Sequence, residues 1–253
     1  MAIKALLFGS LDTLVDTHEI QRHAFNEAFR AAGLDWHWEP GTYKRLLARA
    51  NNESRLVEYA AETGRTLDDE TRDTIQRERI MRFAGLLDDI KAEPRPGADR
   101  LINVALGTGR EVALVSNADA EMVEAFRAKF GQALGMDDFA LVLDRASGHA
   151  PKPASDPYDE ALRQLHLTPD EAVAIEDTGF GVEAAAGAGI AVLGVPTGWT
   201  NEHDFAGALA VVDRLGTVQH PARPLRVPVP MEDDVVTIDW LEGLMLIEEA
   251  QAA

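Results

Sequence analysis

The chain has 253 residues, and 24 Lys and Arg against 43 Asp and Glu leave a formal net charge of −19. This acidic excess argues against DNA, RNA or an anionic membrane as the main partner, because phosphate groups attract basic surfaces. The chain has no cysteine, which excludes disulfides, thiolate metal sites and cysteine nucleophiles. The longest apolar runs are strand-sized and the amino terminus lacks a signal-peptide pattern, so we expect a cytoplasmic protein.

The first strand is expected at residues 3–8, a short apolar run that stops at Gly9 and Ser10. From Thr17 the apolar residues recur at helical spacing, and Gly33 is a natural end for that helix. Three further helices are expected at 41–50, 53–61 and 68–87. Because no strand is expected between residues 18 and 90, this block predicts a helical cap inserted after the first strand.

Beyond residue 94, strands and helices alternate. Strands are expected at 111–116, 140–143, 172–176, 190–195 and 209–212, and helices at 98–106, 120–130, 156–165 and 181–188. Apolar strands that alternate with helices indicate an α/β fold with a parallel sheet covered on both faces. We therefore expect a core of residues 1–17 and 90–216, a cap of residues 18–89 and a C-terminal extension of residues 217–253. The extension is expected to be an extended connection that ends in an amphipathic helix near 240–249, packed on the core.

Polar residues follow the predicted strands at the edge where parallel α/β sheets place their sites. Ser116 and Asn117 follow one strand, Lys152 lies between two prolines, and Glu176 and Asp177 close another strand. Each has an ordinary interpretation: a helix cap, a surface lysine and the start of a turn. Their order nevertheless predicts a phosphate and magnesium site, because hydroxyls and lysine bind phosphate oxygens while carboxylates bind Mg²⁺.

This order of motifs resembles the haloacid-dehalogenase-like (HAD) superfamily, and more closely its capped branch of β-phosphoglucomutases and CbbY-type sugar-bisphosphate phosphatases. The resemblance covers about residues 1–215 and includes the cap segments 22–26 and 33–38. It implies a HAD-like Rossmannoid core with an inserted α-helical cap. It also implies a small phosphorylated molecule, typically a sugar phosphate, as the ligand. Ser116, Asn117 and Lys152 would then bind phosphate, and Glu176 and Asp177 would bind Mg²⁺.

The first motif departs from the family pattern Phe-Asp-x-Asp-Gly-Thr-Leu. In a gap-free alignment, Gly9 replaces the nucleophilic aspartate and Leu11 replaces the acid/base aspartate. Glycine and leucine can perform neither role. We therefore expect a catalytically impaired or inactive phosphatase homologue that retains phosphate-ester binding. The Leu11 carbonyl would remain as a third Mg²⁺ ligand, and the loss of one carboxylate predicts a weak or empty metal site.

Two alternatives remain open at this point. In a shifted register, Ser10 takes the nucleophile position and Asp12 the acid/base position, giving an active Mg²⁺-dependent sugar-phosphate phosphatase, although Ser10 lacks an evident base. Alternatively, the chain is a non-catalytic scaffold that binds another protein. Asp16 is interpreted as a cap or hinge residue. His18, His23 and His149 are interpreted as solvated or capping, because no metal-ligand spacing connects them.

Overall fold

The computed structural model describes residues 2–49, 52–89 and 92–252, and these form a seven-stranded sheet in the order β3-β2-β1-β4-β5-β6-β7. Strands β1 to β6 are parallel, whereas β7 is antiparallel to β6. The strands are β1 (Ala5–Phe8), β2 (Glu111–Val115), β3 (Leu141–Leu143), β4 (Ala172–Glu176), β5 (Ala191–Gly194), β6 (Ala210–Val212) and β7 (Pro224–Arg226). The predicted α/β class with a largely parallel sheet is therefore confirmed.

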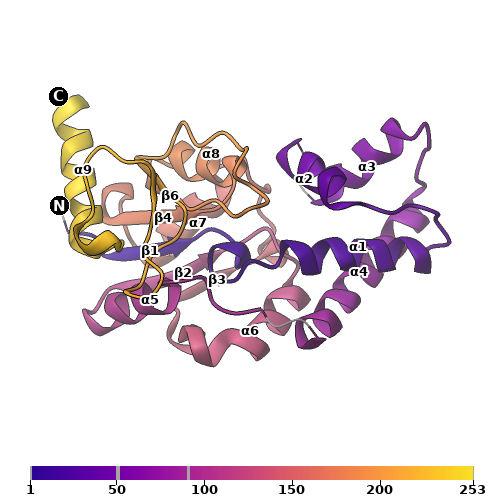
Figure 1. Ribbon diagram of the computed structural model, residues 1–253, viewed down its shortest axis with the longest axis horizontal. Coiled ribbons are helices and arrows are strands. Elements are labelled where there is room, and N and C mark those ends of the chain that lie inside the picture. Colours follow the sequence, from indigo (N-terminus) through magenta and orange to yellow (C-terminus); the bar gives the residue numbers. More distant parts are fainter. Residues whose placement is uncertain (1, 50–51, 90–91, 253) are drawn as a thin grey trace.

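Helices cover both faces of this sheet (Figure 1). They are α5 (Ala98–Gly107), α6 (Ala120–Leu134), α7 (Asp156–Leu165), α8 (Gly179–Gly187) and α9 (Ile238–Ala252). The alternating side chains of β1 divide the core: Leu6 and Phe8 pack in one apolar cluster, while Ala5 and Leu7 pack in the other. Burial on both faces explains why the strands are continuously apolar in the sequence.

The first four helices after β1 form a separate layer at one end of the sheet (Figure 1). They are α1 (His18–Ala31), α2 (Pro40–Arg49), α3 (Asn52–Glu62) and α4 (Asp69–Asp89). Their core is aromatic, with Phe25, Phe29, Trp36, Trp38 and Tyr43 all buried. This arrangement agrees with the expected cap over the carboxyl ends of the strands.

The structure corrects several predicted element bounds. Helix α6 continues to Leu134, four residues beyond the predicted end, because Phe130 and Leu134 still face the core. Helix α8 starts at Gly179, where the Thr178 side chain accepts the Gly181 N–H and caps the helix. The tail, predicted to be an extended connection, contributes the edge strand β7. Residue 50, at the end of a predicted cap helix, lies outside the described residues.

Helix α9 packs on the core, as predicted for the C-terminal extension. Leu241, Leu244 and Met245 are buried in the cluster that includes Leu6 and Phe8. The Glu242 carboxylate accepts hydrogen bonds from the Ile3 N–H at 3.0 Å and from Arg110. The start of the described chain and helix α9 therefore lie together at the end of the molecule opposite the cap (Figure 1). Among the described helices, none combines the length and apolarity needed to span a membrane.

Truncation of a buried side chain of α9 measures how much this docking contributes to stability. Leu244→Ala removes a side chain that is only 3% exposed and is expected to lower the free energy of unfolding by about 2–5 kcal/mol. Leu246→Ala is the matched control, because Leu246 lies on the same helix and is 51% exposed. Urea unfolding of both variants tests this. Equal stabilities would contradict the packing of α9 on the core.

Candidate functional site

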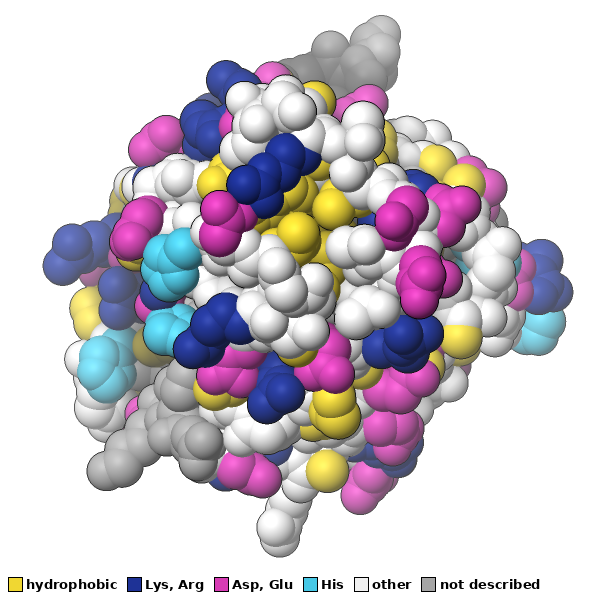
Figure 2. Space-filling view, turned by 90° about the vertical axis from the view of Figure 1, so that its right-hand side faces the viewer, with side chains coloured by type: hydrophobic (Ala, Val, Ile, Leu, Met, Phe, Trp, Pro, Cys, Tyr) yellow, Lys and Arg dark blue, Asp and Glu magenta, His cyan; other side chains and the backbone are white. Residues whose placement is uncertain are grey.

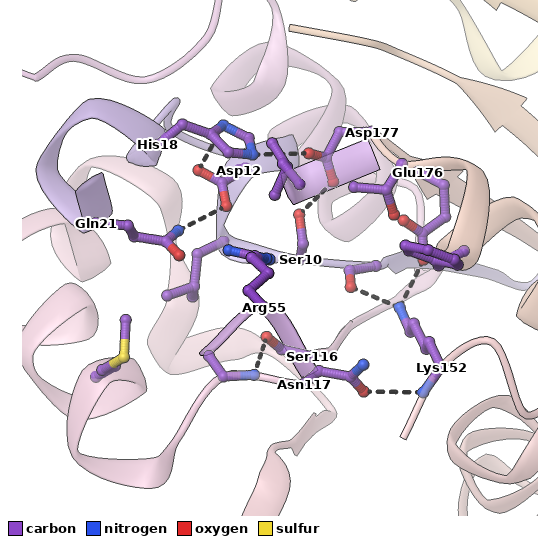
Figure 3. Close-up of a pocket in the computed structure, with 17 residues that line it drawn as sticks. Ser10, Asp12, His18, Gln21, Arg55, Ser116, Asn117, Lys152, Glu176 and Asp177 are labelled. Atoms are coloured by element: carbon purple, nitrogen blue, oxygen red, sulfur yellow. Dashed lines mark hydrogen bonds and ion pairs between the residues drawn. The ribbon is translucent and has the colours of Figure 1, made fainter. Parts of the chain in front are cut away.

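The site lies where β1, β2 and β4 end beneath the cap. In the sheet register Phe8 pairs with Leu114 and Ile175, so the residues that follow these strands emerge side by side. A pocket of about 110 Å³ opens at this edge. It is lined by all the site residues proposed from the sequence, namely Leu11, Asp12, Ser116, Asn117, Lys152, Glu176 and Asp177. Gln21, Leu47 and Arg55 of the cap line it from the other side (Figure 3).

The backbone at Gly9 has no room for a side chain. A Cβ added there would overlap the Glu176 carboxylate and lie 2.6 Å from the Tyr158 hydroxyl. A Cβ at Gly181 would overlap the same carboxylate from the opposite side. The Glu176 carboxylate therefore occupies a slot between two glycines, and it fills the space that a nucleophilic side chain at position 9 would enter.

Lys152 is the centre of a buried network around this slot. Its ammonium group donates to Glu176 Oε1 at 2.5 Å, to the Gly9 carbonyl at 2.6 Å and to the Val115 carbonyl at 2.8 Å. The Tyr158 hydroxyl also donates to Glu176 Oε1, at 2.6 Å. Burial, together with the neighbouring Glu176, raises the pKa of Tyr158 well above 10.0, so this hydroxyl keeps its proton. The lysine is buried, so its ammonium group can bind phosphate only if a phosphate oxygen replaces one of these acceptors.

Ser116 and Asn117 lie at the end of β2, as predicted. The Ser116 hydroxyl oxygen accepts the Ala118 N–H at 3.0 Å, and Asn117 Oδ1 accepts the Lys152 backbone N–H at 3.3 Å. The cap residue of helix α6 is Asp119, not Ser116 or Asn117, so the ordinary interpretation of the pair as that helix cap is wrong. Ser116 instead stabilises the turn after β2, and Asn117 joins that turn to the loop that presents Lys152 to the pocket.

Asp12 is held rigidly at the base of the cap. Its Oδ1 accepts the Thr17 N–H at 2.7 Å and the Thr17 hydroxyl at 2.8 Å, while Oδ2 accepts the Gln21 amide at 3.0 Å. This carboxylate ties the turn after β1 to the first turn of α1. Asp16, predicted as a cap or hinge residue, accepts the His18 backbone N–H at 3.2 Å and so has a capping contact.

The interpretation of His18 as a solvated or capping residue is wrong. Its side chain is 3% exposed and lies among three carboxylates, with Nδ1 near Asp16 and Asp12 and Nε2 facing Asp177. Burial lowers the pKa of His18, but the charge of Asp12 and the hydrogen bond to Asp16 outweigh it, so the pKa lies above 6.5. Burial and the charge of Asp12 raise the pKa of Asp177 to about 7.

His23 is 48% exposed and its Nε2 lies 3.0 Å from the Glu19 carboxylate, in agreement with its interpretation as a solvated residue.

The sequence alone does not predict Arg55 or Tyr158 as residues of the site. Arg55 lies near the start of the cap helix α3, where one arginine among several charged residues does not stand out. Tyr158 does follow Lys152 at a fixed distance within the third motif, and that spacing offered a signal.

Family enzymes hold Mg²⁺ with two carboxylates and a backbone carbonyl, and these donors are only partly present. Position 9 offers no carboxylate. The Leu11 carbonyl accepts the Leu14 N–H at 3.0 Å and the Val15 N–H at 2.9 Å, which uses both of its lone pairs. Of the two predicted carboxylate ligands, Glu176 Oε2 and Asp177 Oδ2 are both buried and without a hydrogen-bond partner among the described residues. Mg²⁺ demands near-octahedral oxygen ligation, and this donor set does not fit it.

The cap-side face of the molecule is electrostatically mixed. Lys and Arg side chains alternate there with Asp and Glu, around a central area where hydrophobic side chains are visible (Figure 2). The cap is joined to the core by an ion pair between Lys44 and Glu202 at 2.8 Å. Trp199 of the core also packs edge-on against Tyr43 of the cap, with ring centroids 5.7 Å apart. Both contacts hold the cap against the core.

The fold and this arrangement of motifs define the class of the protein. Residues 3–189 match the family model of the haloacid dehalogenase-like hydrolases, and the chain belongs to that family. The plasmid-encoded protein CbbY of Cupriavidus necator is 34% identical over 233 residues, which cover 90% of this chain and 91% of the relative. Protein CbbY of Cereibacter sphaeroides is 34% identical over 212 residues, covering 83% of this chain and 92% of the relative.

Solved structures agree with this assignment. CbbY from Rhodobacter sphaeroides in complex with phosphate superposes with a TM-score of 0.77 at 33% identity, covering 84% of this chain and 94% of that chain. A β-phosphoglucomutase from Clostridium difficile gives a TM-score of 0.72 at 18% identity, covering 98% of this chain and 99% of that chain. The second likeness concerns the fold alone.

Because there is no room for a Cβ at Gly9, adding a single methyl group there is expected to destabilise the protein. Gly9→Ala is expected to lower the free energy of unfolding by about 1–3 kcal/mol, because the Glu176 carboxylate cannot retreat toward Gly181. Gly198→Ala is the matched control, since a Cβ there meets no atom within 4 Å. Chemical denaturation measures both. A fully stable Gly9→Ala would mean that Glu176 leaves the slot freely, and that Gly9→Asp can be accommodated as well.

Proposed function

We propose that the protein binds a phosphorylated sugar between core and cap and is impaired in, or incapable of, aspartyl-phosphate catalysis. The observation that carries this proposal is the Glu176 carboxylate in the space beside Gly9. An aspartyl phosphate needs a carboxylate that attacks phosphorus, and the described residues provide none at this position. The leaving oxygen also needs a proton donor, and Leu11 cannot supply one.

Binding of a phosphate ester is supported by the groups that remain in the pocket. The backbone of the turn after β1, Ser116, Asn117 and the Arg55 guanidinium all line it. The absence of a carboxylate at position 9 removes one charge that would repel a bound phosphate. A related CbbY from Rhodobacter sphaeroides, 32% identical, is known in complex with xylulose-1,5-bisphosphate, which favours a sugar bisphosphate as the ligand class here.

Turnover and binding are separated by two measurements on the wild-type protein. Hydrolysis of p-nitrophenyl phosphate, with and without Mg²⁺, is expected to be at background. Inorganic phosphate is expected to raise the unfolding temperature, because a ligand that binds only the folded state stabilises it by RT ln(1 + [L]/Kd). Background hydrolysis without stabilisation by phosphate would contradict the proposal and favour a scaffold that binds another protein.

Lys152 provides a mutational test of phosphate binding. Lys152→Met removes the ammonium group and is expected to weaken phosphate binding at least tenfold, measured by calorimetry. Because the variant also leaves Glu176 buried without its cation, its folding must be verified first, and breaking a buried pair costs about 3–5 kcal/mol. Lys129→Met, on the exposed surface of α6, is the control. Unchanged phosphate affinity in a folded Lys152→Met protein would refute the role of Lys152.

A second candidate is an active phosphatase that uses the shifted register. The specific observation in its favour is the Ser10 hydroxyl, which donates to Asp177 Oδ1 at 2.6 Å and thus has an adjacent proton acceptor. In that case the wild-type protein hydrolyses p-nitrophenyl phosphate, and both Ser10→Ala and Asp12→Asn abolish the activity. Wild-type activity that survives both changes would exclude this candidate.

A further inference from the structure

A buried ion pair joins the cap to the core where α4 and α6 lie side by side (Figure 1). The Arg79 guanidinium of α4 donates to the Asp119 carboxylate at the start of α6, and the Arg79 side chain is fully buried. The guanidinium also donates to Met122 Sδ at 3.1 Å and lies over the Phe25 ring, 5.1 Å from its centroid. A buried charge is stable only with a partner, so this arrangement requires contact between cap and core.

Asp119 contributes to this contact instead of capping its own helix. It is the N-cap residue of α6, yet its side chain makes no capping hydrogen bond to the described residues of that helix. Arg145 also approaches it, with Nε 3.9 Å from Asp119 Oδ1, but Arg145 belongs to the core. The pair with Arg79 is therefore the charged contact through which Asp119 joins the core to the cap.

The ion pair lies away from the two segments that connect cap and core. Those segments are bonded to each other, because the Arg95 N–H donates to the Leu14 carbonyl at 2.7 Å. Arg79 lies ten residues before Asp89, the end of α4, which is ~15 Å along the helix at ~1.5 Å per residue. A rotation of the cap about its connections would therefore separate Arg79 from Asp119.

The same rotation would widen the pocket. Met122, which Arg79 contacts, lines the pocket on the core side, and Leu47 and Arg55 line it on the cap side. The pocket volume of about 110 Å³ is small beside the ~300–1,000 Å³ typical of sites for organic ligands. A phosphorylated sugar therefore needs a wider opening than inorganic phosphate does.

We propose that the ion pair between Arg79 and Asp119 is a latch that holds the cap closed, and that its opening admits the organic part of the ligand. The statement about the ligand rests on the proposed function, whereas the latch is a property of the protein without ligand. Salt screens a buried pair only weakly. The second ion pair between cap and core, Lys44 with Glu202, has a Glu202 side chain that is 74% exposed and contributes little to closure.

The distance between two spin labels, one on the cap and one on the core, tests the latch without any ligand. The chain has no cysteine, so Val57→Cys on α3 and Val104→Cys on α5, both exposed positions, can be labelled specifically. This labelled protein is expected to give one narrow distance distribution. Adding Asp119→Asn, which keeps a good N-cap residue for α6, is expected to raise the population at a second distance at least fivefold. Adding Lys44→Met, the matched control, should leave the distribution unchanged.

A second variant covers the case in which Asp119→Asn fails to fold. The double change Arg79→Met with Asp119→Ser removes both charges, so no buried charge is left without a partner. It is expected to populate the second distance as well. An unchanged distance distribution in a folded variant would overturn the latch, because the pair would then contribute to stability alone.

The rate of ligand association separates failure of the latch from failure of the proposed function. Xylulose-1,5-bisphosphate is expected to associate at least fivefold faster with Asp119→Asn than with the wild type, because a larger fraction of the protein is open. The rate for inorganic phosphate should change less than twofold. Equal rates for the bisphosphate would overturn the gating role. A second distance in Asp119→Asn, combined with no binding of either compound to either protein, would support the latch and contradict the proposed function.

Discussion

The buried ion pair between Lys152 and Glu176 organises the whole site. It lies where three strands end, and it is surrounded by the Gly9 and Val115 carbonyls, the Tyr158 hydroxyl and the slot between Gly9 and Gly181. A buried pair of charges persists only when its remaining hydrogen-bonding capacity is satisfied. Here the Gly9 and Val115 carbonyls satisfy the ammonium group and Tyr158 donates to Glu176 Oε1, whereas Glu176 Oε2 is buried without a hydrogen-bond partner among the described residues. Gly9 and the pair nevertheless depend on each other, because a side chain at position 9 would overlap the Glu176 carboxylate. The packing of Glu176 against Gly9 thus leaves no space for a carboxylate side chain at position 9.

On the other side of the pocket, three carboxylates surround the His18 imidazole. Asp12 and Asp16 join the turn after β1 to helix α1 and enclose the His18 ring. Asp177 faces that ring across the pocket and is bonded to Ser10. The negative charge of these carboxylates therefore lies beside the turn that joins β1 to the cap, around the His18 imidazole.

Much of the fold was predictable because its signals are local. Apolar runs of four to six residues, helical periodicity and strand–helix alternation predicted the parallel sheet, the inserted cap and the docking helix α9. The strand β7 was missed because the proline-rich tail pairs through its backbone with β6, and its side chains are exposed and carry no pattern. The end of α6 was missed because its last turn is stabilised by packing of Phe130 and Leu134, not by helical propensity.

For the site, the sequence by itself determined which groups are available. The motif order placed Ser116, Lys152, Glu176 and Asp177 at one sheet edge. In a gap-free alignment, Gly9 and Leu11 stand at the positions of the family's two catalytic aspartates. Only the tertiary structure decided how those groups are used. Whether Lys152 faces the pocket or Glu176, whether Leu11 offers a free carbonyl, and whether His18 is solvated or buried all depend on contacts between residues far apart in the chain. Such contacts arise from packing the cap and four strand ends together, and no local pattern encodes them.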